Sequence, residues 1–162
     1  MAYLTYIIDN YASLPSTMAF VHPHRSSFIS AWHTDTPLHS NVDALNSLQT
    51  SFVQENGYAN LRCNWNPGCW EKHRKNEHVT PEVWREIFSG TSTNRSASHD
   101  TPPQIGAACC AQFAVSRSQV IKRPLSDFEH FRQWIIDTDM TDAKSGRVFE
   151  FLWHVIFGMR AV

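Results

Sequence analysis

Three histidines and an aspartate near the N-terminus form the first candidate chemical site of this sequence. His22 and His24 are two residues apart after an apolar run of strand length, so both rings point to one side if the extended backbone continues through Pro23. His33 and Asp35 follow closely, and this ligand set suits zinc, manganese or iron. The pattern predicts one divalent metal ion. The alternative is a hydrogen-bonded His22, with His24 and His33 as loop residues that share no partner.

A second candidate site lies near the C-terminus. Glu150 and His154 are four residues apart, so they share a helix face, distinct from the apolar stripe of the same segment. In a cleft, aromatic neighbours would raise the pKa of Glu150 and make it a candidate general base. Arg147, one turn earlier, completes the candidate catalytic set. The alternative is a solvated Glu and His pair worth a few tenths of a kcal/mol.

Arginines and tryptophans supply the candidate substrate-binding residues. Arg25, Arg62 and Arg117, like Arg147, lie at the edges of predicted strands or helices, where a guanidinium can bind phosphate or carboxylate. Solvated arginines, or arginines paired with helix ends, are the alternative. Trp32 and Trp65 are candidates for contacting a substrate, and Trp65 belongs to a loop that could instead bind a partner protein or a glycan.

Composition excludes several classes of protein. The chain has 162 residues with 14 Lys plus Arg against 15 Asp plus Glu, and its nine histidines are the most unusual feature. This near-neutral balance without a basic run argues against nucleic-acid binding. No stretch approaches the ~20 apolar residues of a membrane span, and no signal peptide precedes the first element, so a cytoplasmic location is the default expectation. Motifs of serine hydrolases, nucleoside triphosphatases and dinucleotide-binding enzymes are missing.

The four cysteines fit neither a zinc knuckle nor a secreted disulfide framework. Cys63 and Cys69 are too far apart in sequence for a zinc pair, while Cys109 and Cys110 are adjacent. Because no secretory context is visible, we expect reduced cysteines, with the redox state left open. Cys109 and Cys110 lie in an apolar segment and are interpreted as packing residues rather than nucleophiles.

Hydrophobic periodicity predicts alternating helices and strands that position these residues. The N-terminal half is predicted to hold a helix over 4–11, a strand over 18–22, a helix capped by Asn41 with an apolar stripe of Val42, Leu45, Leu48 and Phe52, and a strand over 58–63. The C-terminal half is predicted to hold a loop over 64–78, a helix from Pro81, a mobile surface loop over 91–103, the most buried strand over 108–116, a helix opened by the capping box Ser126 to Glu129, and a helix over 147–157 after Gly146. Together they predict one α/β domain over 1–162, with a small mixed sheet flanked by helices.

Five ordered motifs carry a resemblance that covers nearly the whole chain. They are 3–11, with Leu14 and Pro15, then 20–25, 57–63, 109–117 and 145–154. This set resembles a fungal family of uncharacterised domains that is distantly similar to nucleotide-sugar glycosyltransferases of the GT-A type. The resemblance implies a truncated GT-A-like, Rossmann-like fold, because members of the family usually begin with a further strand, helix and strand, often after an N-terminal anchor.

The resemblance also bears on the two candidate sites. His22 and His24 fall where GT-A enzymes carry the acidic pair that holds a divalent metal and the donor diphosphate. Glu150 and His154 fall near the usual positions of a base and a late metal ligand, which implies that both sets face one cleft.

The leading hypothesis is therefore a glycosyltransferase-like enzyme of a fungal biosynthetic pathway, acting on a glycan or tailoring a secondary metabolite at a histidine-rich site. Two alternatives stay open. One is a metal-free isomerase or cyclase that uses Glu150 and His154 as acid and base, and the other is a non-catalytic domain that binds a partner or a glycan.

Overall fold

A computed structural model describes residues 1–26, 34–62, 78–92 and 105–161 of the chain. The predicted loop over 64–78, apart from His78, and most of the predicted mobile loop over 91–103 lie outside the described residues. So do Trp32, His33, Trp65, Cys63 and Cys69.

The described residues form seven α-helices, three short 3-10 turns and three strands. The helices are α1 (Ala2–Asp9), α2 (Asn41–Asn46), α3 (Thr50–Asn56), α4 (Pro81–Phe88), α5 (Arg117–Val120), α6 (Leu125–Asp137) and α7 (Asp142–Ile156). The 3-10 turns are η1 (Tyr11–Ser13), η2 (Pro37–His39) and η5 (Cys109–Ala111), and the strands are β1 (Thr17–Phe20), β2 (Tyr58–Asn60) and β3 (Phe113–Ser116).

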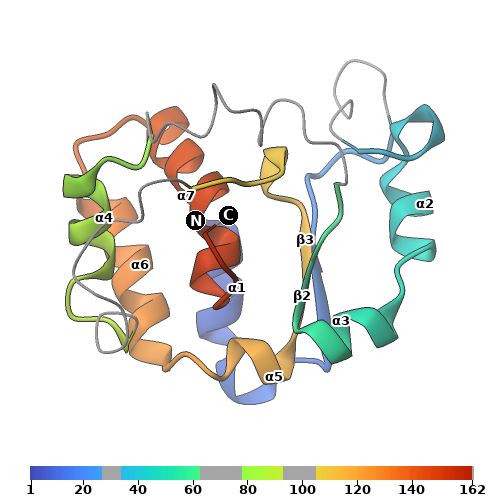
Figure 1. Cartoon of the computed structure of the whole chain (residues 1–162), viewed down its shortest axis with the longest axis horizontal. Coiled ribbons are helices and arrows are strands. Elements are labelled where there is room, and N and C mark those ends of the chain that lie inside the picture. The colour runs from blue at the N-terminus through green and yellow to red at the C-terminus, as the bar shows by residue number, and fades with distance from the viewer. Residues whose placement is uncertain (27–33, 63–77, 93–104, 162) are drawn as a thin grey trace.

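The three strands form one sheet in the order β1-β3-β2. Phe113 of β3 is opposite Phe20 of β1 and Asn60 of β2, and both pairings are antiparallel. Helices α1, α4, α6 and α7 lie on one side of the sheet, and α2 and α3 lie on the other (Figure 1). The predicted α/β class is confirmed. The described strand pairs are antiparallel throughout, whereas a mixed sheet was expected, and they do not supply the parallel strands on which a Rossmann-like fold is built.

An aromatic cluster around Phe113 forms the centre of the hydrophobic core. Phe113 is fully buried in the central strand, as its position in the most apolar predicted strand requires. Five aromatic rings have their centroids within 4.8–5.9 Å of a neighbour in this cluster: Tyr3, Phe20, Tyr58, Trp153 and Phe157. Because each such pair adds about 0.5–1.5 kcal/mol beyond its buried area, the cluster fixes β3 against α1 and α7.

The prediction of one helix after residue 41 is wrong in two respects. The helix is not continuous, and the predicted apolar stripe is not its buried face. The chain breaks between α2 and α3, and Gln49 adopts an extended conformation there. The predicted stripe is therefore divided between two helices, and Val42, Leu45 and Phe52 are 43%, 38% and 50% exposed. Val53 is buried instead.

The N-cap of α2 also differs from the prediction. The side chain of Ser40 accepts the Asp43 amide proton, so Ser40 is the N-cap and Asn41 is the first helical residue. Asn41 is buried, and its amide bonds elsewhere.

The predicted capping box at Ser126 does not form, because α6 begins at Leu125, after Pro124, and Ser126 lies inside the helix. Asp127 is instead the acceptor in a buried ion pair. Its carboxylate lies 2.8 Å from Arg123 Nη1 and accepts the Ser92 amide and hydroxyl. Arg123 Nε donates to the Ile156 carbonyl at 2.7 Å. This pair ties the start of α6 to the end of α7, and burial lowers the Arg123 pKa, while Asp127 opposes that shift.

The remaining boundaries follow local signals to different degrees. α4 begins as predicted, with the Thr80 side chain accepting the Val83 amide and Pro81 in the first turn. α7 begins at Asp142 rather than Arg147, so Gly146 lies inside the helix instead of before it.

Two glycines give a matched test of this packing. Gly57 has a φ of 81°, and an added Cβ would collide with the buried Gln119 side chain, so Gly57→Ala should lower the free energy of unfolding by about 1–3 kcal/mol. Gly146 lies in a helix with nothing within 4 Å of an added Cβ, so Gly146→Ala should raise it by about 0.5–1 kcal/mol. Urea unfolding of both variants measures this, and equal effects would contradict the described packing.

Candidate functional site

Polar side chains gather at one end of the sheet because its strands are antiparallel. The residues that follow β1 and β2 lie at the same end as the residues that precede β3. This is the upper end of the sheet in Figure 1. His22, Arg62 and Gln112 come from these three segments, and α7 adds Glu150.

A buried amide network fixes the backbone on either side of Pro23. The side-chain oxygen of Gln112, Oε1, accepts the His22 amide proton at 2.9 Å. The NH2 group of the same side chain donates to Thr34 Oγ1 at 3.3 Å. Thr34 donates to Asn41 at 2.5 Å, and Asn41 Nδ2 donates to the carbonyls of His22 and His24 at 3.1 and 2.6 Å. Thr34, Asn41 and Gln112 are buried, so this network holds the His22 to His24 segment in one conformation.

The main chain of Cys110 connects the two candidate sites of the sequence. Its amide donates to Glu150 Oε1 at 2.5 Å, and its main chain also hydrogen-bonds to His22. Glu150 Oε2 accepts from Arg147 Nη1 at 2.6 Å. The structure therefore brings His22, Glu150 and Arg147 together, with exposed His24 near enough to influence the charge of His22.

The pKa of His22 is lowered, and burial is the main cause. The negative charge of Glu150 and the hydrogen bond to Cys110 oppose this shift, whereas His24 adds to it. Because its pKa is lowered, the His22 ring is neutral near pH 7, and the Glu150 carboxylate can stabilise the ring when it is protonated.

Arg62 and Asp35 form an ion pair at the same end of the sheet. Arg62 is buried, its Nε lies 3.6 Å from Asp35 Oδ1, and its Nη1 donates to Cys110 Sγ at 3.4 Å. Arg62 was predicted to bind substrate, but its guanidinium already contacts Asp35 and Cys110 within the protein.

Cys110 is disulfide-bonded, so for this residue the redox state that the sequence left open is the oxidised one and not the reduced one. The side chain of its partner lies outside the described residues. Cys110 and Ala111 have φ angles of 85° and 48°, so a 3-10 turn replaces the first part of the strand predicted over 108–116. Left-handed residues cannot continue a pleated strand, and β3 begins only at Phe113.

Two predicted site residues, His154 and Arg117, lie away from this site, and a third, Arg25, lies near it. His154 is buried, on the core side of α7 rather than on a separate face, and its Nε2 lies 3.3 Å from the Ala161 carbonyl. Arg117 is exposed at the opposite end of the sheet, where β3 ends. Arg25 is exposed near the site, and its carbonyl accepts the Asn41 amide.

The described residues do not supply a complete set of ligands for the predicted metal ion. Within these ranges, no three His, Cys, Asp or Glu side chains are grouped so that they could hold an ion. A further histidine, His39 in the turn η2, places Nδ1 2.7 Å from the Thr34 carbonyl. The predicted ligand His33 lies outside the described residues, so the metal stays a prediction.

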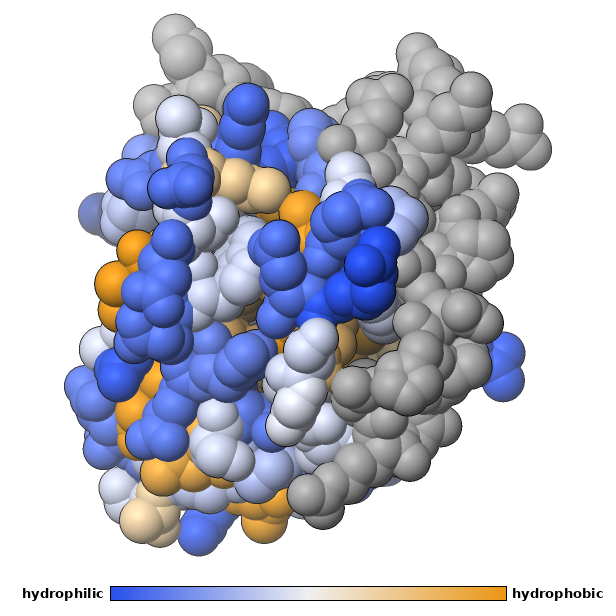
Figure 2. All heavy atoms as spheres, turned by 90° about the vertical axis from the view of Figure 1, so that its left-hand side faces the viewer, coloured by the Kyte–Doolittle hydropathy of each residue, from blue (hydrophilic) through white to orange (hydrophobic). Residues whose placement is uncertain are grey.

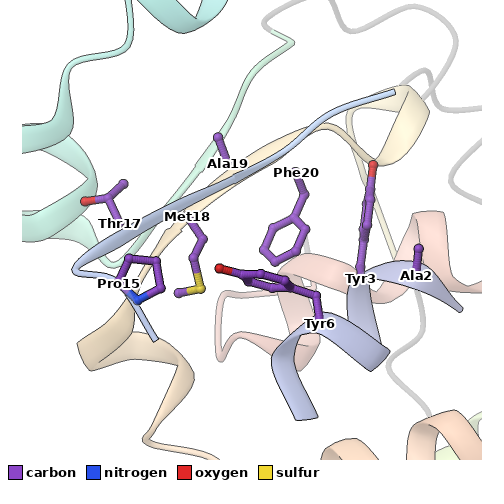
Figure 3. A pocket seen from close by; sticks show the side chains of 8 residues that line it. All are labelled: Ala2, Tyr3, Tyr6, Pro15, Thr17, Met18, Ala19 and Phe20. Atoms are coloured by element: carbon purple, nitrogen blue, oxygen red, sulfur yellow. The ribbon is translucent and has the colours of Figure 1, made fainter. Parts of the chain in front are cut away.

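Two hollows lie away from this site. One, of about 430 Å³, lies between α1 and β1, where Met18 and Phe20 point toward Tyr3 and Tyr6 (Figure 3). The other, of about 730 Å³, includes Glu86, Trp134 and Asp137 in its lining, from helices α4 and α6. Those helices belong to the largely hydrophilic face of Figure 2. The described linings contain none of the predicted site residues.

The fold and site define an α/β domain whose polar centre is assembled at one end of a three-stranded sheet. Over residues 1–162 the chain matches the family described as "Protein of unknown function (DUF3431)", and it belongs to that family. No curated protein matches the chain, and no solved structure matches it. In the described parts of the chain, no helix is both long and apolar enough to cross a membrane.

The burial of His154 makes a pH prediction. Burial lowers its folded pKa below the ordinary value, so the unfolded chain binds more protons as the pH falls through about 6.5. The free energy of unfolding should therefore decrease between about pH 7.5 and pH 5.5. A His154→Gln variant cannot titrate but can still donate to the Ala161 carbonyl, and it should lose less stability over this range. Urea unfolding at both pH values measures the difference, and equal losses would contradict this role.

Proposed function

We propose that this protein is an enzyme that transfers a proton through His22 on a small-molecule or glycan substrate. The observation that carries this proposal is the bridge through Cys110, whose amide bonds to Glu150 and whose main chain also bonds to His22. A histidine held at the edge of a site and linked to a fixed carboxylate is a common arrangement of a general acid or base.

The two side chains have different roles in this proposal. His22 is neutral near pH 7 because burial lowers its pKa, so its ring can accept a proton from a bound substrate. Glu150 has both oxygens engaged, one by the Cys110 amide and one by Arg147, so it acts as a fixed negative charge that stabilises protonated His22. The metal-free alternative first used Glu150 and His154 as its acid and base. In the present proposal the pair His22 and Glu150 takes that role.

The charges around the site favour an anionic substrate group. Arg147 is 47% exposed beside Glu150, and Arg25 is exposed on the segment that follows His24. Guanidinium groups bind phosphate or carboxylate with paired hydrogen bonds. A sugar phosphate or another acidic metabolite meets this requirement, and glycosyltransferase-like tailoring in a fungal biosynthetic pathway is the finer form of the proposal.

Substitution of His22 tests the catalytic part. Wild-type protein is incubated with a panel of nucleotide sugars, sugar phosphates and carboxylic acids, and turnover is followed by proton NMR. His22→Gln should lower the rate about 10²- to 10⁴-fold, the usual contribution of a general acid or base. Glu150→Gln should lower it less, because the amide retains shape but not charge.

The control for this experiment is His130→Gln, which changes a histidine on α6 whose ring lies 3.3 Å from the Glu86 carbonyl. It should leave turnover unchanged. A folded His22→Gln protein with wild-type turnover would overturn the proposal.

A divalent metal at His22 and His24 is the second candidate, favoured by the closeness of these two rings. In that case, purified wild-type protein contains one equivalent of zinc, manganese or iron, and a His22→Ala, His24→Ala double variant contains none. Elemental analysis and thermal unfolding with added metal measure this. If wild-type protein neither holds a metal nor gains thermal stability from one, the metal is removed from the proposal.

A further inference from the structure

The outer edge of β1 is a part of the sheet that the proposed function does not use. The strand order β1-β3-β2 gives β1 a single neighbour, and no described strand lies beyond it. Its pairing with β3 runs from Thr17 to Phe20 without a bulge, and the strand contains no charged residue and no proline. Charges, prolines and bulges are the usual devices that keep another strand from pairing with an edge. Within the described residues, β1 has none of them.

The register shows which main-chain groups of β1 point outward. The Arg117 amide donates to the Ser16 carbonyl at 2.9 Å, so residue 16 directs its main chain toward β3. This direction alternates along an antiparallel strand, so Met18 also faces β3, whereas Thr17 and Ala19 direct their N–H and C=O groups away from it. Ala19 is exposed. The open edge therefore offers main-chain donors and acceptors at the spacing of a strand.

A hollow of about 430 Å³ borders this edge, between β1 and α1 (Figure 3). Met18 and Phe20 form its strand side, and the ring of Tyr6 on α1 lies 6.0 Å from that of Phe20, edge to face. Tyr6 is 41% exposed, so solvent reaches the hollow. The described residues that line it carry no charge. Because aromatic rings and a methionine sulfur pack well against a further ring, the hollow suits an aromatic side chain.

The edge and the hollow are arranged for a single occupant. A strand added to β1 would hydrogen-bond to Thr17 and Ala19, and its residue opposite Met18 would carry its side chain on the same face of the sheet as Met18. That face borders the hollow. A peptide can therefore satisfy the main-chain groups of the edge and fill the hollow at once, as in other complexes formed by strand addition.

We propose that the free edge of β1 binds an extended, uncharged segment of a partner protein as a fourth strand, with an aromatic side chain of that segment in the hollow between β1 and α1. This inference goes beyond the proposed function, because proton transfer at His22 does not require it. A second copy of this chain fits less well. Its own Met18 and Phe20 are 5% and 6% exposed, so they are packed in its core and are not free to enter the hollow.

The test adds the capped peptide acetyl-Ser-Thr-Phe-Thr-Ser-amide to the full ¹⁵N-labelled chain and follows the amides by NMR. With the Phe opposite Met18, the two Thr of the peptide pair with Thr17 and Ala19. The amide signals of Thr17 and Ala19 should shift, and their hydrogen exchange should slow at least about tenfold near saturation. Met18 and Phe20, which already face β3, should keep their exchange rates. No shift of the Thr17 and Ala19 signals up to about 5 mM peptide would overturn the proposal.

N-methylated forms of the peptide are the matched controls. A methyl group on the amide of either Thr removes a hydrogen bond to β1 and blocks close approach, so it should weaken binding at least about tenfold. The same group on the Phe amide points away from β1 and should change the affinity less than about threefold. Equal affinities of these methylated peptides would overturn the strand pairing, because the hollow would then bind the ring alone.

A Tyr6→Ala variant tests the hollow, and Ile136→Ala, which truncates an exposed side chain of α6, is its control. Wild type should bind the Phe peptide about tenfold more tightly than the peptide with Ala in its place. Tyr6→Ala should lose most of this preference, while Ile136→Ala keeps it. An unchanged preference in folded Tyr6→Ala protein would overturn the role of the hollow.

The same NMR measurement without peptide distinguishes a second copy from a partner segment. Exchange at Thr17 and Ala19 should be independent of protein concentration in the absence of peptide. If protection of these two amides rises with protein concentration, the edge pairs with another copy of the chain, and the proposal is overturned.

Discussion

The position of Phe113 in the middle of the sheet is the constraint on which the rest of the structure depends. Its ring lies among five other aromatic side chains. Four belong to α1, α7 and the neighbouring strands, and the fifth is Phe157, just after α7. Gln112 precedes it and turns the opposite way in the pleat, toward His22 and Thr34. The same backbone position therefore fixes the core and the amide network of the site. A displacement of Phe113 would move both.

The helical side of the domain is held by polar contacts as well as by apolar packing. The buried Arg123 and Asp127 pair joins Ser92, the start of α6 and the end of α7. Removing one partner of such a pair commonly costs about 3–5 kcal/mol, because the other charge is left buried. Since α7 also carries Glu150, this pair supports the site from a distance.

Local signals in the sequence predicted those features that depend on local structure. Thr80 with Pro81 identified the start of α4, and the apolar run before His22 identified β1. The stripe at Val42 and Phe52 failed because burial depends on what a helix faces, and a break at Gln49 changed that face. Of the site, residue spacing indicated His22 and Glu150 as separate candidates, and only the family resemblance implied that both sets face one cleft. The sequence reading missed Asn41 and Gln112, since a buried amide has no spacing pattern and Asn41 also fits a helix cap. It also missed the bridge through Cys110, which depends on a left-handed turn at Cys110 and Ala111 that no local sequence motif predicts.

The strand order has a consequence for how the chain folds. β1 and β2 come first in the sequence but never touch, because β3 lies between them. Residues 17–60 therefore have no sheet to join until residue 116 is available, and the contact between His22 and Gln112 spans 90 positions. Such long loops close slowly, since the entropy of closure is lost before the contacts form. During this interval the aromatic side chains of β1 and β2 lack their partner, so the early chain is the form most exposed to aggregation and to chaperones.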